Sequence, residues 1–227
     1  MSDKYPSISP YAYCAWNPVK LVDPDGEFGI PTHNKIVKDA INNKGFSKQQ
    51  YRKILWGTSW SADVFHPHKD FHMDNYHNFK DVKDRICNAI EGYHEKIEKE
   101  DFKGAGWDLH TIADFYSHSN YVELYQKYAD DAELGVGGIP LFTDVVNNPK
   151  YSEFNQLLEK ELRTGDFSNG LKDFFSKDET SHKMMNHDTP NKVMGKRKFG
   201  NITGYEFAYS LAEREINKTV GTNNNEQ

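Results

Sequence analysis

Cysteine is scarce in this chain of 227 residues, which contains only Cys14 and Cys87. The two cysteines lie far apart in the sequence, so the chain offers neither a disulfide framework nor a cysteine-based zinc site. Any transition metal must therefore be held by histidine and carboxylate side chains. The ten histidines of the chain make such a site feasible.

Long hydrophobic runs and excess positive charge are missing as well. No stretch approaches the ~18 apolar residues of a membrane-spanning helix, and the start Met-Ser-Asp-Lys lacks the apolar core of a signal peptide. A net charge of −6 argues against an enzyme held on nucleic acid by bulk positive charge, so no bulk nucleic-acid binding is expected. These absences favour a soluble globular protein, and the length favours one main domain.

Helical periodicity dominates the sequence from residue 32 onward, and no strand pattern of useful length occurs. The clearest amphipathic segment spans residues 79–99, where apolar residues recur every three or four positions opposite a charged face. The sequence therefore predicts an all-α, multi-helix domain over residues 29–220, followed by a disordered tail at 221–227. The expected helices cover residues 32–41, 47–56, 79–99, 106–128, 153–162, 170–175 and 205–218.

Three ionisable side chains line one face of the expected helix 106–128. His110, Asp114 and His118 are each four residues apart, which places neighbouring Cβ atoms about 5–6 Å apart. Their nitrogen and oxygen atoms are ligands that suit Zn²⁺. The other faces of the helix are apolar, so the helix should be buried, and a buried line of ionisable groups needs compensation. A metal would supply it; a metal-free, hydrogen-bonded His–Asp ladder is the alternative.

Further candidate ligands lie upstream and downstream of this helix. Residues 59–77 are dense in histidine and aspartate, but density alone does not select among His66, His68 and His77, which could all be solvated. His33 stands in the first expected helix, and His182 lies in a later loop. The residues by themselves leave this choice open.

The order of these residues resembles the zinc-dependent phospholipase C and fungal zinc nuclease superfamily. The run HTIADFYSHSNYVE at residues 110–123 is most similar to bacterial relatives of the fungal heterokaryon-incompatibility C proteins. The resemblance covers most of residues 30–218 and implies an all-helical phospholipase C-like domain with three zinc ions, which His110 and Asp114 bridge. In that family a carboxylate usually follows the last histidine by four positions. Here residue 186 is Asn, so Glu123 or Asp188 would substitute for it, or one zinc is weakly held or absent. The implied metal ligands are His33, Asp63, His72, His110, Asp114, His118 and His182.

Such a ligand set implies hydrolysis by two or three zinc ions. Clustered Zn²⁺ lowers the pKa of a bound water toward ~7 and stabilises the charge that develops on a phosphodiester. Asp63 is expected to orient or deprotonate that water, and Asp114 to stay ionised between the cations. We therefore expect a phospholipase C-like phosphodiesterase that acts on phospholipid or a membrane substrate. A zinc nuclease of the same fold and a non-catalytic, metal-stabilised membrane-acting module are the alternatives.

Residues 1–28 differ from the rest of the chain, because they are rich in Tyr, Pro and Ser and carry turn signals without a helical period. The runs YAYCAWNPV at 11–19 and DPDG at 23–26 resemble the closing motif of the core domain of bacterial Rhs/YD-repeat proteins. That resemblance implies that 1–28 is a short extended end of an Rhs core, with cleavage near Phe28. It also implies that the remainder is an interbacterial toxin effector, delivered to a target cell without a classical signal peptide. The expected partners are the rest of the Rhs core and an immunity protein.

Overall fold

The computed structural model describes residues 30–58, 72–129, 135, 137–167, 177–181, 184–187, 190, 194–196 and 198–221. Helices make up nearly all of the regular structure in these residues, which confirms the all-α class. The strands β1 (Lys198–Phe199) and β2 (Ile202–Thr203) form a short antiparallel pair beside them. The helices are α2 (Ile30–Ile41), α3 (Lys48–Trp56), α4 (Phe79–Glu98), α5 (Phe102–His118), α6 (Tyr121–Tyr128), α7 (Phe142–Val146), the 3₁₀ helix η3 (Pro149–Tyr151), α8 (Ser152–Glu161) and α10 (Gly204–Val220).

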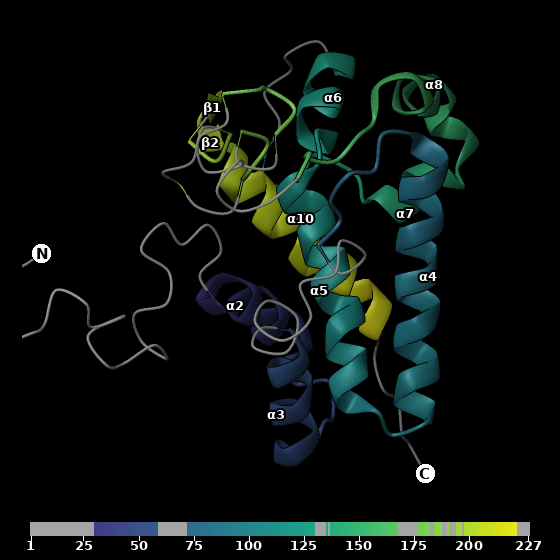
Figure 1. The fold of residues 1–227 in the computed structure, drawn as a ribbon, viewed down its shortest axis with the longest axis vertical. Coiled ribbons are helices and arrows are strands. Elements are labelled where there is room, and N and C mark those ends of the chain that lie inside the picture. The colour runs from purple at the N-terminus through teal and green to yellow at the C-terminus, as the bar shows by residue number, and fades with distance from the viewer. Residues whose placement is uncertain are drawn as a thin grey trace, which may run out of the picture.

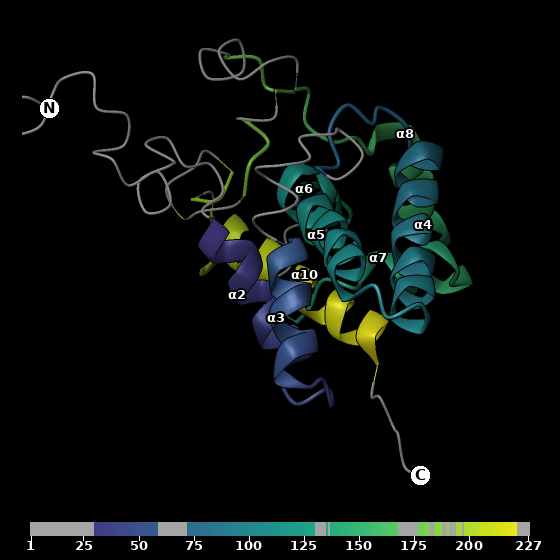
Figure 2. The same ribbon diagram turned by 60° about the horizontal axis from the view of Figure 1, so that its bottom comes forward.

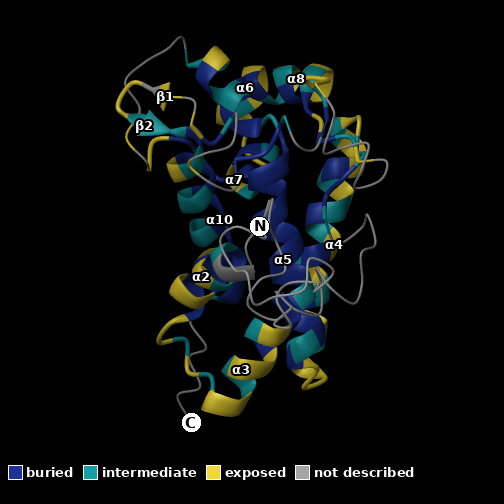
Figure 3. Cartoon of the chain, turned by 60° about the vertical axis from the view of Figure 1, so that its left-hand side comes forward, coloured by how far each residue is buried: buried dark blue, intermediate teal, exposed yellow. Residues whose placement is uncertain are grey.

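Helix α5 runs through the centre of the bundle, between α4 on one side and α2 and α3 on the other, with α10 crossing it (Figures 1 and 2). Almost every side chain of α5 is buried, whereas the surrounding helices each expose one face to solvent (Figure 3). The sequence explains this arrangement, because α5 has apolar residues all around its axis while α4 has a single apolar stripe. Anything that α5 carries at mid-length is therefore held deep inside the domain.

Two glycines allow α3 to approach α5 closely. A Cβ atom placed on Gly106 would lie 2.2 Å from the carbonyl oxygen of Ile54, and one on Gly57 would lie 2.1 Å from the carbonyl oxygen of Lys103. No side chain fits at either distance, so the contact between these two helices is made backbone to backbone. The close approach contributes to fixing the position of α5 in the bundle.

Most helix starts follow from local capping. Ser47 accepts a hydrogen bond from the Gln50 backbone N–H while the Gln50 side chain accepts one from Ser47, and Thr203 and Glu206 form the same reciprocal box at α10. The predicted helices at 47–56, 79–99, 153–162 and 205–218 correspond to α3, α4, α8 and α10, within two residues at each end. The first expected helix, 32–41, begins two residues earlier than predicted.

The expectation of one helix over residues 106–128 is wrong. The chain leaves α5 after His118, because Ser119 adopts an extended conformation (φ −111°, ψ 163°) and pairs with Thr164 in an isolated β-bridge. Asn120 then binds the backbone of the 161–163 segment from both sides: its Nδ2 donates to Glu161 O at 2.9 Å, and its Oδ1 accepts from Arg163 N at 3.0 Å. These tertiary hydrogen bonds replace the helical ones that a continuous helix would have made, and α6 starts after the break at Tyr121. The front of the helix also begins earlier, at Phe102, where Asp101 caps it.

Several predictions concern parts of the chain outside the described residues. They are the Rhs-like segment 1–28, the helix at 170–175 and the tail from residue 222. Among the described helices, none is both long and apolar enough to cross a membrane.

Candidate functional site

The buried face of α5 carries three of the predicted ligands. The side chains of His110, Asp114 and His118 are 0%, 1% and 2% exposed, respectively. Their spacing of one helical turn directs them to the same side of α5, as the sequence predicts. His110 lies one turn before Asp114 and His118 one turn after it, so the carboxylate has an imidazole of its own helix on each side.

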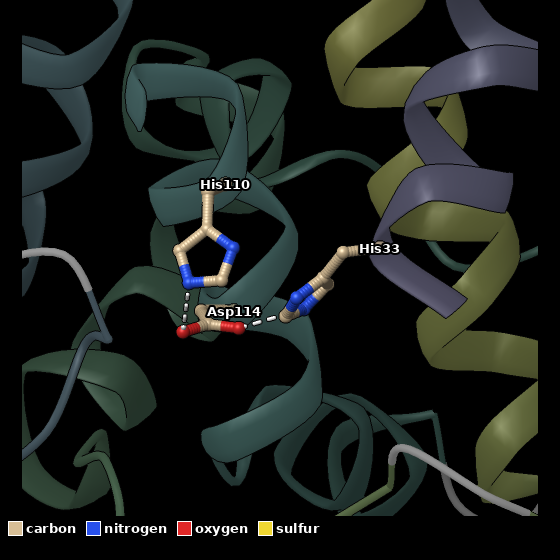
Figure 4. Close-up of side chains that lie close together, drawn as sticks. All are labelled: His33, His110 and Asp114. Atoms are coloured by element: carbon tan, nitrogen blue, oxygen red, sulfur yellow. Dashed lines mark ion pairs between the residues drawn. The ribbon is translucent and has the colours of Figure 1, made fainter. Parts of the chain in front are cut away.

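Two more predicted ligands reach this carboxylate from other parts of the chain. His33 comes from α2, which packs across α5 and is buried at that position, and His72 comes from the segment that precedes α4. Figure 4 shows His33 and His110 converging on Asp114 from two different helices. One atom from each of these three residues lies within 4.8 Å of the other two. We call the five residues His33, His72, His110, Asp114 and His118 the Asp114 cluster.

The two carboxylate oxygens of Asp114 face different pairs of histidines. Oδ2 lies 3.3 Å from His72 Nδ1 and 3.3 Å from His110 Nε2. Oδ1 lies 2.8 Å from His33 Nε2 and 3.8 Å from His118 Nε2. The carboxylate therefore has one pair of imidazole nitrogens near each oxygen, and His33, His110 and Asp114 together could hold a metal ion.

The first of these groups has the dimensions of a zinc site. His72 Nδ1 and His110 Nε2 are 3.2 Å apart, so with Oδ2 they form a triangle with edges of 3.2, 3.3 and 3.3 Å. Ligands that bind a tetrahedral Zn²⁺ at about 2.0–2.1 Å lie roughly 3.3 Å from one another. The triangle is therefore compatible with one face of a zinc tetrahedron, and its 3.2 Å edge between His72 and His110 is equally that of a hydrogen bond. Around Oδ1 the separations of 2.8 and 3.8 Å do not match that edge.

Asp114 is buried as a charged group. Burial raises the pKa of its carboxyl, but the neighbouring His110 and His33 outweigh this and hold the pKa well below its usual value. Four imidazole nitrogens surround the two carboxylate oxygens, and the nearest, His33 Nε2, lies 2.8 Å from Oδ1. An enclosed anion among imidazoles is compensated either by a shared cation or by a metal-free hydrogen-bonded ladder.

Solvent reaches the described part of the cluster at His72. Its side chain is 20% exposed, whereas the other four members of the cluster are at most 2% exposed. Solvent therefore reaches the cluster on the Oδ2 side of Asp114.

The structure also separates the remaining candidates. Asp63 and His182, like His66 and His68, lie outside the described residues, so their place in the site stays a prediction. His77, the other candidate of the same upstream run, contacts Asp166 at 3.4 Å instead, with 62% of its side chain exposed. Of the residues proposed to replace the missing carboxylate at Asn186, Glu123 contacts His187, and Asp188 is not described.

One pair of residues was missed by reasoning from the sequence. His187 is fully buried, and its Nε2 lies 2.8 Å from Oε1 of Glu123. His187 stands five residues after His182 in the same loop, but nothing in its spacing distinguished it as a partner of α6. Glu123 was considered only as a substitute metal ligand. Their contact is tertiary, between residues 64 positions apart.

Comparison with family models, with curated proteins and with solved structures gave no match for this chain. The function is therefore inferred from the geometry of the Asp114 cluster and from the resemblances of residues 11–26 and 110–123.

Proposed function

We propose that the chain is a zinc-dependent phosphodiesterase of the phospholipase C type, with Asp114 as the bridging ligand of at least two zinc ions. The observation that carries the proposal is the division of four histidines between the two oxygens of one buried carboxylate, with separations at Oδ2 close to a zinc tetrahedron's edge. Imidazole and carboxylate are ligands that Zn²⁺ prefers, and the two cysteines of the chain are not needed.

The residues of the cluster have distinct roles in this proposal. Asp114 stays ionised and would hold the zinc ions through its two oxygens, while His110 and His33 contact those oxygens from two helices. His72, as the exposed member, borders the face where a substrate phosphate would enter. Bound zinc would supply an activated water and stabilise the charge on the phosphoryl group. Asp63 and His182 are proposed to complete the ligand set, with Asp63 as the residue that orients the water.

The proposed substrate class rests on the resemblance of residues 110–123 to the phospholipase C superfamily. A phospholipid head group is favoured over nucleic acid because the net charge of −6 disfavours bulk binding to a polyanion. The Rhs-like motifs in residues 1–28 extend the proposal to a toxin effector that is released from an Rhs core and bound by an immunity protein in the producing cell.

A structural metal centre is the second candidate, and one observation favours it. Four of the five members of the cluster are at most 2% exposed, and structural zinc sites are closed whereas catalytic ones keep an open position. In that case zinc would stabilise the fold and no substrate would be turned over.

The test compares the purified wild type with Asp114→Asn and Asp108→Asn. Asp108 is a matched control, since it is a buried aspartate on the same helix whose carboxylate contacts Lys96 Nζ at 2.6 Å, away from the cluster. Metal content is measured by elemental analysis, and hydrolysis is assayed on phosphatidylcholine vesicles and on single- and double-stranded DNA. We expect two or three zinc ions per chain and release of phosphorylated head group, both lost in Asp114→Asn and kept in Asp108→Asn.

Each other outcome selects a different conclusion. Zinc without turnover of any substrate identifies the structural centre, and cut DNA with intact lipid identifies the nuclease. A wild type that stays folded, binds no zinc and remains inert after zinc is added overturns the proposal and leaves the Asp114 cluster as a hydrogen-bonded ladder.

A further inference from the structure

Three hydrogen bonds hold His187 and fix the orientation of its ring. Its backbone N–H and its ring Nδ1–H both donate to the carbonyl oxygen of Ser117, at 2.9 and 3.0 Å, and its Nε2–H donates to Oε1 of Glu123 at 2.8 Å. A carbonyl and a carboxylate can only accept, so both ring nitrogens carry protons and the ring is an imidazolium. Burial lowers the pKa of this histidine, but the facing Glu123 outweighs it and raises the pKa above the usual value. His187 and Glu123 therefore form an ion pair in which the histidine is fully buried and the carboxylate side chain is 15% exposed.

This pair is attached to the last turn of α5. The chain leaves the helix at Ser119, so the carbonyl of Ser117 has no partner within the helix and takes its two donors from His187 instead. A positive charge at this end also suits the helix dipole. The next carbonyl, that of His118, accepts from the backbone N–H of Gly165 at 2.8 Å. The backbone before and after the His118 side chain is therefore held by residues that are distant in the sequence.

Apolar packing alone does not define this position. The pair borders a cavity of about 310 Å³, which is also lined by Ser119, Asn120, Arg163 and three methionines. Ser117, His118 and His187 are nevertheless at most 3% exposed, so hydrogen bonds act together with packing to fix where the α5 terminus lies. Directional bonds restrain both distance and angle, which a metal ligand requires more strictly than a packed side chain does.

We propose that His187 and Glu123 are positioning residues that orient His118 toward Oδ1 of Asp114 through their hold on Ser117. The inference rests on the proposed zinc function, in which the 3.8 Å separation between His118 Nε2 and Asp114 Oδ1 is one edge of a metal site. Neither residue of the pair binds the metal. Partners that orient a ligand typically change metal affinity by about 10- to 100-fold when they are removed.

The two ring nitrogens of His187 can be tested separately by amide substitutions. The side-chain amide of asparagine matches the position of Nδ1, so His187→Asn keeps a donor toward Ser117 O but loses Glu123. The longer glutamine matches Nε2, so His187→Gln keeps a donor toward Glu123 but loses Ser117 O. If the hold on Ser117 positions His118, zinc affinity should fall about 10-fold or more in His187→Gln and clearly less in His187→Asn. Glu123→Gln, which keeps the shape of the side chain, should show an intermediate loss.

The experiment measures zinc dissociation constants by competition with a chromophoric chelator, alongside the unfolding midpoint in urea for each protein. Lys96→Met is the control for general loss of stability, because it removes the partner of buried Asp108 on the same helix. A weakened zinc affinity in His187→Gln, with Lys96→Met unchanged, supports the proposal. Equal affinity in all variants, equal weakening in Lys96→Met, or equal weakening in His187→Asn and His187→Gln overturns it. A wild type that binds no zinc instead defeats the proposed function itself, so the two failures are distinguishable.

Discussion

Removing one histidine should cost one metal site, whereas removing Asp114 should cost both. The structure assigns His72 to Oδ2 of Asp114 and His33 to Oδ1, so His72→Gln disrupts only the Oδ2 group while Asp114→Asn removes the ligand that the groups share. The two substitutions should therefore leave different numbers of zinc ions bound per chain. His77→Gln is the matched control, because it makes the same change at an exposed histidine of the same run.

The size of the effect follows from linkage between binding and folding. A ligand present at 100 times its dissociation constant stabilises the folded state by about 2.7 kcal/mol per site. Two sites would add about 5 kcal/mol to the free energy of unfolding, and one site about half of that. For a chain of 150–250 residues each kcal/mol moves the melting temperature by about 2–4 °C. Zinc should therefore raise the melting temperature of the wild type by about 10–20 °C and that of His72→Gln by about 5–10 °C.

The assay is thermal unfolding followed by far-ultraviolet circular dichroism in a zinc buffer of known free concentration, with isothermal titration calorimetry for the number of sites. We expect shifts in the order wild type and His77→Gln, then His72→Gln, then Asp114→Asn with almost none. The bridging geometry is refuted if Asp114→Asn keeps one intact site, or if His72→Gln loses as much stabilisation as Asp114→Asn does.

Two further predictions concern the parts of the fold that hold the cluster in place. Gly106→Ala places a Cβ 2.2 Å from Ile54 O, so its free energy of unfolding, measured in urea, should fall by about 1–3 kcal/mol. Gly137→Ala is the control, because a Cβ there meets nothing within 4 Å and the free energy of unfolding should not change. An unchanged unfolding midpoint for Gly106→Ala contradicts the close approach of α3 and α5. The pKa of His187 is raised in the folded protein, so its stabilising contribution is fully present below the unfolded pKa of about 6.5 and is lost as the pH rises through the folded value. In chelator-treated protein the stability difference between wild type and His187→Asn should therefore shrink between pH 6 and pH 9, and a difference that grows would show the ring to be neutral.

Local pattern was sufficient for most of the helices. The stripe of Val82, Ile86, Ala89 and Tyr93 in α4 and the capping residues at α3 and α10 depend on neighbours within a few positions, so they can be read without knowledge of the fold. The same holds for the line of metal-ligand candidates on α5, because a spacing of four residues is one helical turn in any helix. The end of that helix could not be read in this way, because its break depends on hydrogen bonds to residues 161–165.

The sequence by itself determined the all-α class, the exclusion of cysteine ligands and the placing of His110, Asp114 and His118 on one face. Only the tertiary structure decided how His33 and His72 divide between the two oxygens of Asp114, and that His77 stays on the surface. The tertiary structure also brings His187 into contact with Glu123 next to the end of α5. The physical reason is range: periodicity and capping act over one or two helical turns, whereas metal geometry and buried ion pairs require atoms from distant segments to meet within about 3 Å.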